Sequence, residues 1–554
     1  MKFTAAVSSM FLALTLSQAQ EYTVKWKKTM MDASRTGVKI ASADDVKESM
    51  GEMRGTKYYA PNGKVFKKGV TPKVARVMLD AQPEMADVKQ VVAYSTNAMS
   101  VEYPESALSD WYVDLLIGQC AEITGKRVDV GIVNFGGIRV DMPKGNVLRD
   151  DIMSMFPFRN KLCYLEIKGK DVRAIFEQLA AEKWQVVGGA RCVISKDGRL
   201  ISAEIGGEPL DDDKVYGVTT LDFLLNGGDG LHVQKNALSV QVLDGYVIDI
   251  VLPYVQKLTA EGKPIEYHTD GRIKIVESPM KKILSFMAAL VMVAASMSAQ
   301  DLVIVHFNDT HSHLEPIRAS EPGKGTGGVI ERAACLDSIR TANGKRNVLL
   351  LHAGDFSQGT SYFTKLKGDI EIKVINAMKY DVVTLGNHEF DNGIEELSRR
   401  MKSLKCKVVC ANYDFSSFEL GKYVKPYAIV HKGGMKIGVF GLLTDITRVV
   451  ARETADRIPK IDTYEAANKW ADYLKNERHC DMVIALTHIG FDEGTICDPD
   501  LVENTRNIDI VVGGHSHTFL DDVKFRKNLD GKEIPIVQNG CWGLNVGELD
   551  VYKN

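Results

Sequence analysis

The sequence predicts an α/β protein with two domains in one chain. Its 554 residues are enough for two or more separately packed cores. A hydrophobic content of 45% and a charged content of 25% are ordinary for a globular protein. Short apolar runs, typical of buried strands, alternate with stretches of helical periodicity in both halves.

Charge and histidine placement narrow the possible functions. The formal net charge is −3, and no basic stripe interleaved with aromatic residues is visible, so a nucleic-acid polymer is a disfavoured partner. Of the twelve histidines, only His232 and His268 precede residue 300. Imidazole chemistry is therefore expected in the second half of the chain.

Two segments have the layout of a secretory signal peptide. Residues 1–19 contain a lysine, an apolar run and a small-residue exit at Ser17-Gln18-Ala19. A second such segment lies within 278–300, where Met280-Lys281-Lys282 is followed by the apolar run Ile283–Ala295. At about 17 residues up to Ala299, this run is short for a membrane span of ~20 residues.

The internal segment allows two interpretations. In the first, it is the signal peptide of a neighbouring reading frame joined to this one, and cleavage at both sites gives two exported products. In the second, it is a transmembrane or interfacial helix, with membrane association through 283–299. A span would leave the second half in the cytoplasm and the lysines outside, against the positive-inside rule. We therefore favour the first interpretation, and we expect an exported protein of the periplasm or cell envelope, with membrane anchoring by the internal segment as the alternative.

The first half, residues 20–277, alternates strands and helices around glycine-rich turns. Such turns are common structural features and say little alone. The predicted strands are Val128–Val133, Leu162–Ile167 and Val215–Thr220, the predicted helix is Lys170–Ala181, and the turns lie in Asn134–Arg139 and Phe223–Gly230.

The second half, residues 301–554, contains five motifs that each follow an apolar run. The motifs are Asp309-Thr310-His311, Gly354-Asp355, Gly386-Asn387-His388-Glu389, Thr487-His488 and Gly513-Gly514-His515-Ser516-His517. The preceding runs are Leu302–Phe307, Val348–Leu351, Asp381–Leu385, Met482–Leu486 and Ile508–Val512. Because ligands bind beyond the carboxyl ends of strands in α/β sheets, we expect the motifs to share one site.

The residue types in these motifs predict a pair of divalent ions. Carboxylate, amide and imidazole groups without thiolate suit Zn, Mn, Fe or Co. The set is too large for one ion, and paired ions are suited to phosphoryl transfer. A single histidine of this set would more often be an ordinary core or surface residue, so the prediction depends on the five motifs together. The nine cysteines, including the pair Cys406 and Cys410, are expected to be buried free thiols.

With these motifs in this order, residues 301–554 resemble the catalytic domain of the 5'-nucleotidase branch of the calcineurin-like metallophosphoesterases. The resemblance implies an αββα sandwich with two central sheets. It also implies a catalytic pair, His388 and Asp391, and a histidine at a position where the family often has glutamine, His517. The implied ligands are Asp309, His311 and His517 for one ion, Asn387, His488 and His515 for the other, and Asp355 as the bridge.

The first half resembles the substrate-recognising C-terminal domain of the same family, most clearly from about 90 to 245. The motifs that carry this resemblance are Asn134–Arg139, Pro157-Phe158-Arg159-Asn160 and Phe223–Gly230. It implies that Phe158 and Phe223 sandwich a nucleobase, that Asp229 binds ribose hydroxyls, and that Asn134 and Arg139 hold substrate oxygens. Glu102 stands where the family has an arginine, and the two domains occur in reversed order.

The expected activity is hydrolysis of nucleoside 5'-monophosphates or related nucleotides by a water activated by two divalent ions. The alternatives are a 2',3'-cyclic phosphodiesterase or a broad phosphomonoesterase, with the first half only a ligand-binding or docking module. A metal-binding structural protein is a third hypothesis, which the pair His388 and Asp391 argues against. The expected partners are a small nucleotide or phosphoester substrate and, for each half of the chain, the other half.

Overall fold

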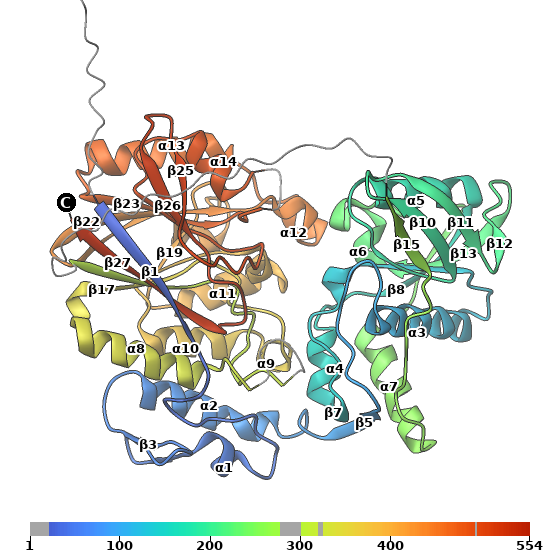
Figure 1. The fold of residues 1–554 in the computed structure, drawn as a ribbon, viewed down its shortest axis with the longest axis horizontal. Coiled ribbons are helices and arrows are strands. Elements are labelled where there is room, and N and C mark those ends of the chain that lie inside the picture. Colours follow the sequence, from blue (N-terminus) through green and yellow to red (C-terminus); the bar gives the residue numbers. More distant parts are fainter. Residues whose placement is uncertain (1–21, 278–300, 319–324, 493–495, 554) are drawn as a thin grey trace, which may run out of the picture.

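The computed structural model describes residues 22–277, 301–318, 325–492 and 496–553. The two segments predicted to be signal peptides, 1–19 and 278–300, lie outside these residues. Within the described ranges, no helix combines the length and the apolar character needed to cross a bilayer. Figure 1 shows a larger lobe that contains the second half of the chain together with the first residues of the first half, in blue, and a smaller lobe, mostly teal and green, formed by the rest of the first half.

The larger lobe is built on two sheets that pack face to face. The seven-stranded sheet has the order β1-β27-β16-β17-β18-β19-β20, and the six-stranded sheet has the order β21-β22-β23-β24-β26-β25. The strands of the first are β1 (Tyr22–Met30), β27 (Asn545–Lys553), β16 (Leu302–Phe307), β17 (Val348–His352), β18 (Val382–Thr384), β19 (Lys407–Val409) and β20 (Val424–Lys425). Those of the second are β21 (Tyr427–Lys432), β22 (Met435–Leu443), β23 (Met482–His488), β24 (Ile510–Val512), β26 (Glu533–Val537) and β25 (Lys524–Lys527).

Apolar side chains fill the space between the two sheets. Ile304 and Leu349 of the first sheet share one core with Val439 and Ile484 of the second, and all four side chains are fully buried. Because parallel strands covered on both faces must be apolar on both, their sequences are nearly continuous hydrophobic runs. The five runs predicted as strands are therefore all present, as β16, β17, β18, β23 and β24.

Helices cover the outer face of each sheet. The seven-stranded sheet carries α8 (Val329–Asn343), α9 (Ser361–Leu366), α10 (Asp369–Met378) and α11 (Gly393–Ser403), and the six-stranded sheet carries α13 (Thr463–Asp472) and α14 (Asp498–Glu503). The short helix α12 (Arg452–Ala455) lies on the side near the smaller lobe (Figure 1). The predicted α/β class and the αββα sandwich are confirmed.

The smaller lobe has its own core around two further sheets and a two-stranded ribbon. One sheet has the order β14 (Ser239–Val242), β8 (Leu162–Lys168), β13 (Val215–Leu221), β6 (Val130–Val133) and β9 (Val186–Gly188). The other has the order β12 (Glu208–Pro209), β11 (Leu200–Ile205), β10 (Ala190–Ser195) and β15 (Ile273–Val276), and the ribbon is β5 (Val91–Ser95) with β7 (Gly145–Leu148). The helices are α3 (Ala107–Thr124), α4 (Arg149–Met155), α5 (Gly169–Ala181), α6 (Asp222–Leu225) and α7 (Val247–Ala260).

Helix α3 shows how local sequence sets element boundaries in this lobe. Ser106 is its N-cap, and the Ser106 hydroxyl accepts a hydrogen bond from the backbone N–H of Ser109. Gly125 ends the helix in the left-handed conformation, at φ 66°. The helix is thereby held beside β6 and β9, in the core that supports the loop after β6.

The first residues of the chain do not belong to the smaller lobe. Residues 22–85, here called the N-terminal arm, comprise β1, α1 (Val46–Met50), β2 (Glu52–Arg54), β3 (Lys57–Tyr59), β4 (Val65–Phe66) and α2 (Thr71–Met85). Strand β1 joins the seven-stranded sheet, and the arm shares its core with the second half. This arrangement differs from a single domain over 20–277, because the apolar residues of the arm are buried against the larger lobe.

Candidate two-metal site

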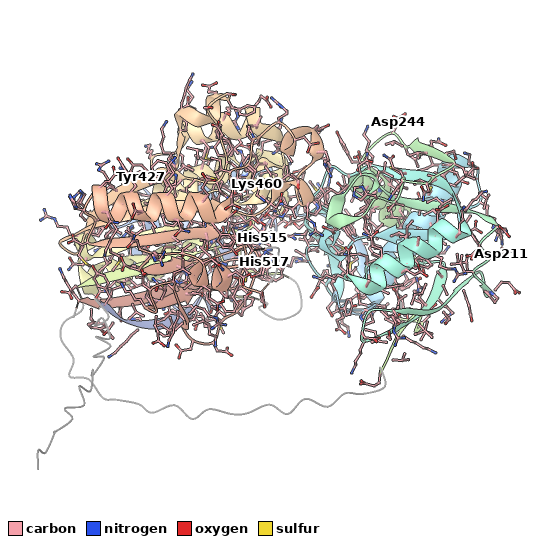
Figure 2. All side chains as sticks on the ribbon, turned by 90° about the horizontal axis from the view of Figure 1, so that it is seen from above. Asp211, Asp244, Tyr427, Lys460, His515 and His517 are labelled. Atoms are coloured by element: carbon pink, nitrogen blue, oxygen red, sulfur yellow. The ribbon has the colours of Figure 1, made fainter. Side chains whose placement is uncertain are left out.

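The five predicted motifs converge at the carboxyl ends of strands from both sheets. Strands β16, β17 and β18 lead to the loops that carry Asp309, Asp355 and Asn387, and β23 and β24 lead to those with His488 and His515. The strand ends therefore meet where the two sheets face each other. His515 and His517 lie on the side of the larger lobe that faces the smaller lobe (Figure 2).

The ligand loops have an unusual backbone conformation. Asp309, His311, Asp355, His515 and His517 all have positive φ, at 48°, 45°, 52°, 85° and 55°. Such conformations are costly for residues other than glycine and are typical of functional sites whose surroundings enforce them. The fold thus holds these side chains in place at a cost to backbone energy.

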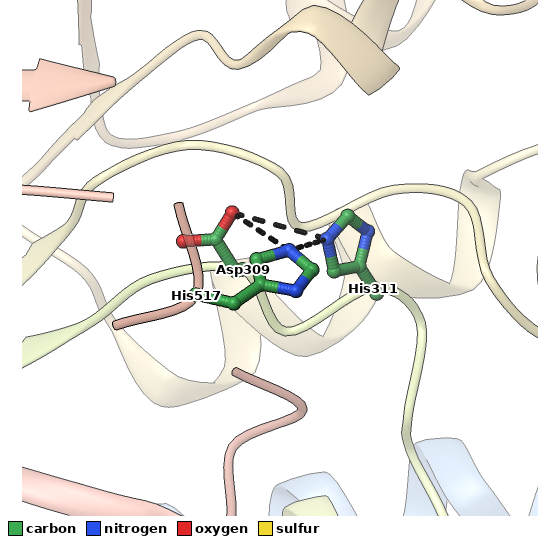
Figure 3. A group of neighbouring side chains, drawn as sticks. All are labelled: Asp309, His311 and His517. Atoms are coloured by element: carbon green, nitrogen blue, oxygen red, sulfur yellow. Dashed lines mark hydrogen bonds and ion pairs between the residues drawn. The ribbon is translucent and has the colours of Figure 1, made fainter. Parts of the chain in front are cut away.

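The first cluster joins Asp309, His311 and His517 (Figure 3). One ligand atom of each lies within 4.8 Å of the others. The Nε2 atoms of His311 and His517 are 2.9 Å apart, and Asp309 Oδ1 is 3.5 Å from His517 Nε2. Three buried or half-buried donor groups thus point at one position.

The second cluster joins Asp355, His488 and His515 in the same way. His488 Nε2 is 3.1 Å from Asp355 Oδ2 and 3.3 Å from Asn387 Oδ1. Asp355 Oδ2 is also 3.7 Å from His311 Nε2 of the first cluster. Asp355 therefore lies between the two clusters, where a bridging carboxylate would have to be.

The charges at the site favour cation binding. Burial opposes ionisation of Asp309 and Asp355, yet the adjacent imidazoles, His488 foremost, keep the pKa of both carboxyls below the ordinary value. Burial also opposes the charged form of His488, but Asp355 and Asp309 raise its pKa to about 9. The negative charges of the two buried carboxylates are therefore balanced by a positively charged imidazole. A bound metal cation would balance the same charges.

The donor set and the backbone both fit divalent ions. Carboxylate, amide and imidazole groups are ligands for hard to borderline metals. Two glycines let the loops approach each other closely, since a Cβ on Gly386 would lie 2.1 Å from Asp355 Oδ1 and one on Gly514 would lie 2.9 Å from Asp309 Oδ2. The residues present thus form a cradle that any larger side chain at these glycines would disrupt.

His388 lies beside the clusters and is oriented by a carboxylate. Its Nδ1 is 2.9 Å from Asp391 Oδ2, and its backbone N–H donates to Asp355 Oδ1 at 2.9 Å. Burial disfavours the charged ring, but Asp391 and Asp355 outweigh burial and raise the pKa of His388. The ring centroid is 5.3 Å from that of His311, so the His388 ring faces the site, and its raised pKa favours the charged form there.

Two residues of the smaller lobe reach the metal clusters. Arg139 Nη2 is 3.3 Å from His311 Nε2, and the ring centroid of Phe158 is 5.9 Å from that of His388. Arg139 is also 6.0 Å from the centre of the Phe158 ring. The predicted substrate contacts Arg139 and Phe158 therefore lie at the site itself.

The remaining predicted substrate residues lie on neighbouring loops of the smaller lobe. Asn134 Nδ2 donates to Asp229 Oδ2 at 2.8 Å, so these two side chains contact each other. Phe223 lies in α6 and packs against Gly228, where an added Cβ would come within 2.7 Å of the Phe223 ring. Glu102 is exposed and accepts a hydrogen bond from the Ser100 hydroxyl at 3.0 Å.

Glu389 is a site residue to which the sequence assigned no role. Its carboxylate accepts hydrogen bonds from the backbone N–H groups of Asp355, Ser357 and Gly386, at 2.9, 3.0 and 2.6 Å. It is fully buried, and burial followed by the charge of Asp355 raises its pKa to about 7. In the sequence, only its position directly after His388 could have indicated a role for Glu389. The donors Asp355 and Ser357 come from a loop more than 30 residues away in sequence.

Two arginines of the larger lobe were also missed. Arg448 and Arg452 lie against the loop Phe223–Gly230, where a Cβ on Gly230 would be 2.8 Å from Arg448 Nη2 and one on Gly227 would be 3.0 Å from Arg452 Nη2. Both belong to short helical segments without a recognisable motif, and only the contact between lobes brings them to this loop.

Comparison with known proteins agrees with this geometry. Residues 86–236 match the family model described as 5'-nucleotidase, C-terminal domain, and residues 302–519 match calcineurin-like phosphoesterase. The chain is 34% identical over 273 residues to snake venom 5'-nucleotidase from Naja atra, covering 45% of this chain and 50% of that protein. It is 33% identical over 276 residues to human 5'-nucleotidase, covering 46% of each.

Among solved structures, a 5'-nucleotidase precursor from Thermus thermophilus is 35% identical with a TM-score of 0.40, covering 44% of this chain and 49% of that one. The chain thus spans about half the length of the curated relatives it matches.

Residues 302–519 thus match a calcineurin-like phosphoesterase domain and residues 86–236 match the C-terminal domain of 5'-nucleotidases, and the resemblance stated from the sequence is confirmed. The domain named for the C-terminal end of 5'-nucleotidases comes first here, so the order is reversed.

Proposed function

We propose that the protein is a metal-dependent phosphoester hydrolase that acts on nucleoside 5'-monophosphates or related nucleotides. The observation that carries this proposal is the pair of ligand clusters that meet at Asp355, with His388 and its partner Asp391 beside them. The 5'-nucleotidase names of the similar proteins support the same activity.

The ligands proposed for one ion are Asp309, His311 and His517, those for the other are Asn387, His488 and His515, and Asp355, which lies between the two sets, would be shared. When bound, two divalent ions would supply Lewis-acid chemistry, activating water and neutralising phosphate charge. Zn, Mn, Fe and Co all suit this donor set.

The protein's own residues would bind, orient and protonate the substrate. Arg139 reaches His311 and presents a guanidinium that suits bidentate contact with phosphate oxygens. His388, whose pKa Asp391 and Asp355 raise, would in its charged form stabilise negative charge or donate a proton to the leaving oxygen. Phe158 offers an aromatic face for a nucleobase, and the contact between lobes at this point excludes water.

The second candidate is a 2',3'-cyclic phosphodiesterase or a broad phosphomonoesterase. Glu102 stands where the resemblance implies an arginine, and an anion in place of a phosphate-holding cation weakens the case for a strict 5'-monophosphate enzyme.

We further propose that the protein is exported and acts in the periplasm or cell envelope. The support is the pattern of residues 1–19 and 278–300, and a mass measurement of the mature species would test cleavage at both. Membrane association through 283–299 is the competing outcome of that measurement.

A substrate panel on the purified full chain, after metal analysis, tests the activity. We expect hydrolysis with Mn, Zn or Co, and a kcat/KM for nucleotides about 5- to 150-fold above that for p-nitrophenyl phosphate, the range expected from stacking one base. Preference for 2',3'-cyclic nucleotides would select the second candidate. Absence of hydrolysis in the metal-loaded protein would contradict both.

A further inference from the structure

The N-terminal arm contributes an edge strand to the sheet that carries three of the metal loops. Strand β1 pairs antiparallel with β27 over nine residues, from Tyr22 opposite Lys553 to Met30 opposite Asn545. Strand β27 pairs in turn with β16, which leads to Asp309. Without β1, the backbone groups along one side of β27 would form an open sheet edge.

Helix α2 of the arm packs against the outer helices of the larger lobe. It contacts α8 and α10, and Figure 1 shows it beside both. Val74, Ala75 and Met78 are fully buried in the same core as Leu336 and Ile375. Residues of α2 such as Lys73 are exposed, so the helix has one apolar face, which the arm's own β2 and β3 and the helices α8 and α10 of the second half cover together.

Two acidic residues of α8 have their hydrogen-bond donors on the arm. Asp337 accepts from the backbone N–H groups of Val70 and Thr71, each at 2.9 Å, and from the Thr71 hydroxyl at 2.7 Å. These donors lie at the N-terminus of α2, where a carboxylate is favourable. Gly69 lets the chains approach, since a Cβ there would lie 2.3 Å from an Asp337 oxygen.

The second acid, Glu331, is 1% exposed. It accepts from the backbone N–H of Arg35 at 3.1 Å and from the hydroxyl of Thr36 at 2.5 Å. A buried carboxylate without such partners carries a large desolvation cost. The second half therefore presents two acids whose donors come from the first half.

The arm also contacts the segments that lead to the metal loops. Met31 N–H donates to Leu544 O at 2.8 Å, close to Trp542, whose own N–H donates to Asp309 O at 2.7 Å. The Trp26 indole donates to His306 Nε2 at 3.0 Å, three residues before Asp309. The arm is thus structurally part of the larger lobe.

We propose that the arm is the docking element through which the first half binds the second, and that the halves remain a noncovalent complex when the chain is broken between residues 277 and 301. The partner of the arm is the second half itself, recognised by strand addition along β27, by an apolar helix face and by the two acids of α8. This association does not depend on hydrolysis or on bound metal.

Cleavage of the full chain tests the proposal. A specific protease site is introduced between residues 277 and 301, the folded protein is cut, and the product is analysed by size-exclusion chromatography with mass detection. Co-elution of both fragments at the size of the uncut chain is the expected result. Elution as two separate species at micromolar concentration would overturn the proposal.

Two matched variants assign the association to the arm. Val74→Asp places a charge in the apolar face of α2, and Lys73→Asp places the same charge on its exposed face as the control. After cutting, we expect Val74→Asp to dissociate and Lys73→Asp to co-elute like the parent. Co-elution of cut Val74→Asp at the parent's dissociation constant would show that the arm is not the docking element.

A milder variant keeps the test valid if Val74→Asp fails to fold. Asp337→Ala removes the acceptor of two N–H groups and one hydroxyl but leaves the arm sequence intact. We expect it to raise the dissociation constant of the cut halves by about tenfold, the effect of leaving buried donors unpaired. An unchanged dissociation constant would contradict the docking role.

Discussion

The proposed metal ligands and the proposed substrate contacts of this protein are held in different ways. The proposed ligands lie at the ends of strands from two packed sheets, are buried or half-buried, and belong to loops that are partly fixed by backbone hydrogen bonds to Glu389. Arg139 and Phe158 come from loops of the smaller lobe and reach the site only across the boundary between lobes. Metal retention should therefore be a property of the larger lobe, and substrate choice a property of the smaller one.

Substitution of the shared ligand should cause the largest loss. Asp355→Ala removes the carboxylate that lies between the two clusters. Two bound cations would then repel each other with no negative charge between them. We expect loss of bound metal and of turnover on every phosphoester, by about 10⁴-fold or more. Metal content by atomic spectrometry and turnover of p-nitrophenyl phosphate measure this.

The exposed residue Asp521 provides the matched control, because Asp521→Ala removes a carboxylate from the surface of the same lobe. Circular dichroism should show both variants folded. Full metal occupancy in Asp355→Ala would remove Asp355 from the ligand set.

Replacement of the oriented histidine should separate catalysis from metal binding. His388→Asn removes the ring whose pKa Asp391 and Asp355 raise, while the two ligand clusters stay complete. Turnover should fall by about 10²–10⁴-fold, the range for loss of acid–base assistance, with unchanged metal content. The control is His431→Asn on an exposed position of β21, and a loss of metal in His388→Asn would make His388 a ligand.

The sequence predicted the convergence of the five motifs more fully than the rest of the site, for a physical reason. Each proposed ligand follows an apolar strand, so its position is set by a local pattern, and the parallel strands of each sheet end at the same edge. Glu389 depends on hydrogen bonds from a distant loop, and Arg448 on contact with another lobe. No local sequence pattern indicates the hydrogen bonds of Glu389 or the contact of Arg448 with the smaller lobe.

The N-terminal arm illustrates the same limit at the level of the fold. Its strand and helix have ordinary local patterns, but the surface that buries them begins almost 300 residues later, at β16. The predicted domain began at residue 20 because it was drawn as one continuous stretch of the chain. The hydrophobic core instead groups residues whose apolar faces pack together, wherever they lie in the sequence. The assigned roles of Phe158, Phe223 and Asp229 stay predictions.

Weakening the Glu389 network should affect metal affinity more than turnover. Glu389→Gln keeps the size of the side chain but replaces one acceptor oxygen with an NH₂ group among several backbone N–H donors. We expect metal affinity to fall by about 10- to 100-fold, the usual effect of losing a partner that orients the ligands, with near-normal turnover at saturating metal. Metal titration of activity measures this, and the exposed Glu419→Gln is the control.

The smallest effect is expected for a substitution in the smaller lobe. It tests most directly whether metal binding belongs to the larger lobe and substrate choice to the smaller one. Phe158→Ala removes an aromatic face beside His388 and Arg139 and leaves every proposed metal ligand in place. The KM for nucleotides should rise by about tenfold, within the roughly 1–3 kcal/mol that stacking on one base contributes. The KM for p-nitrophenyl phosphate should change little, and Tyr94→Ala, at an aromatic residue 51% exposed on the same lobe, should change neither. Equal effects of Phe158→Ala on both substrates would mean that the ring supports His388 instead of a nucleobase, and substrate choice would then have to be sought at Arg139 and the loop around Asp229.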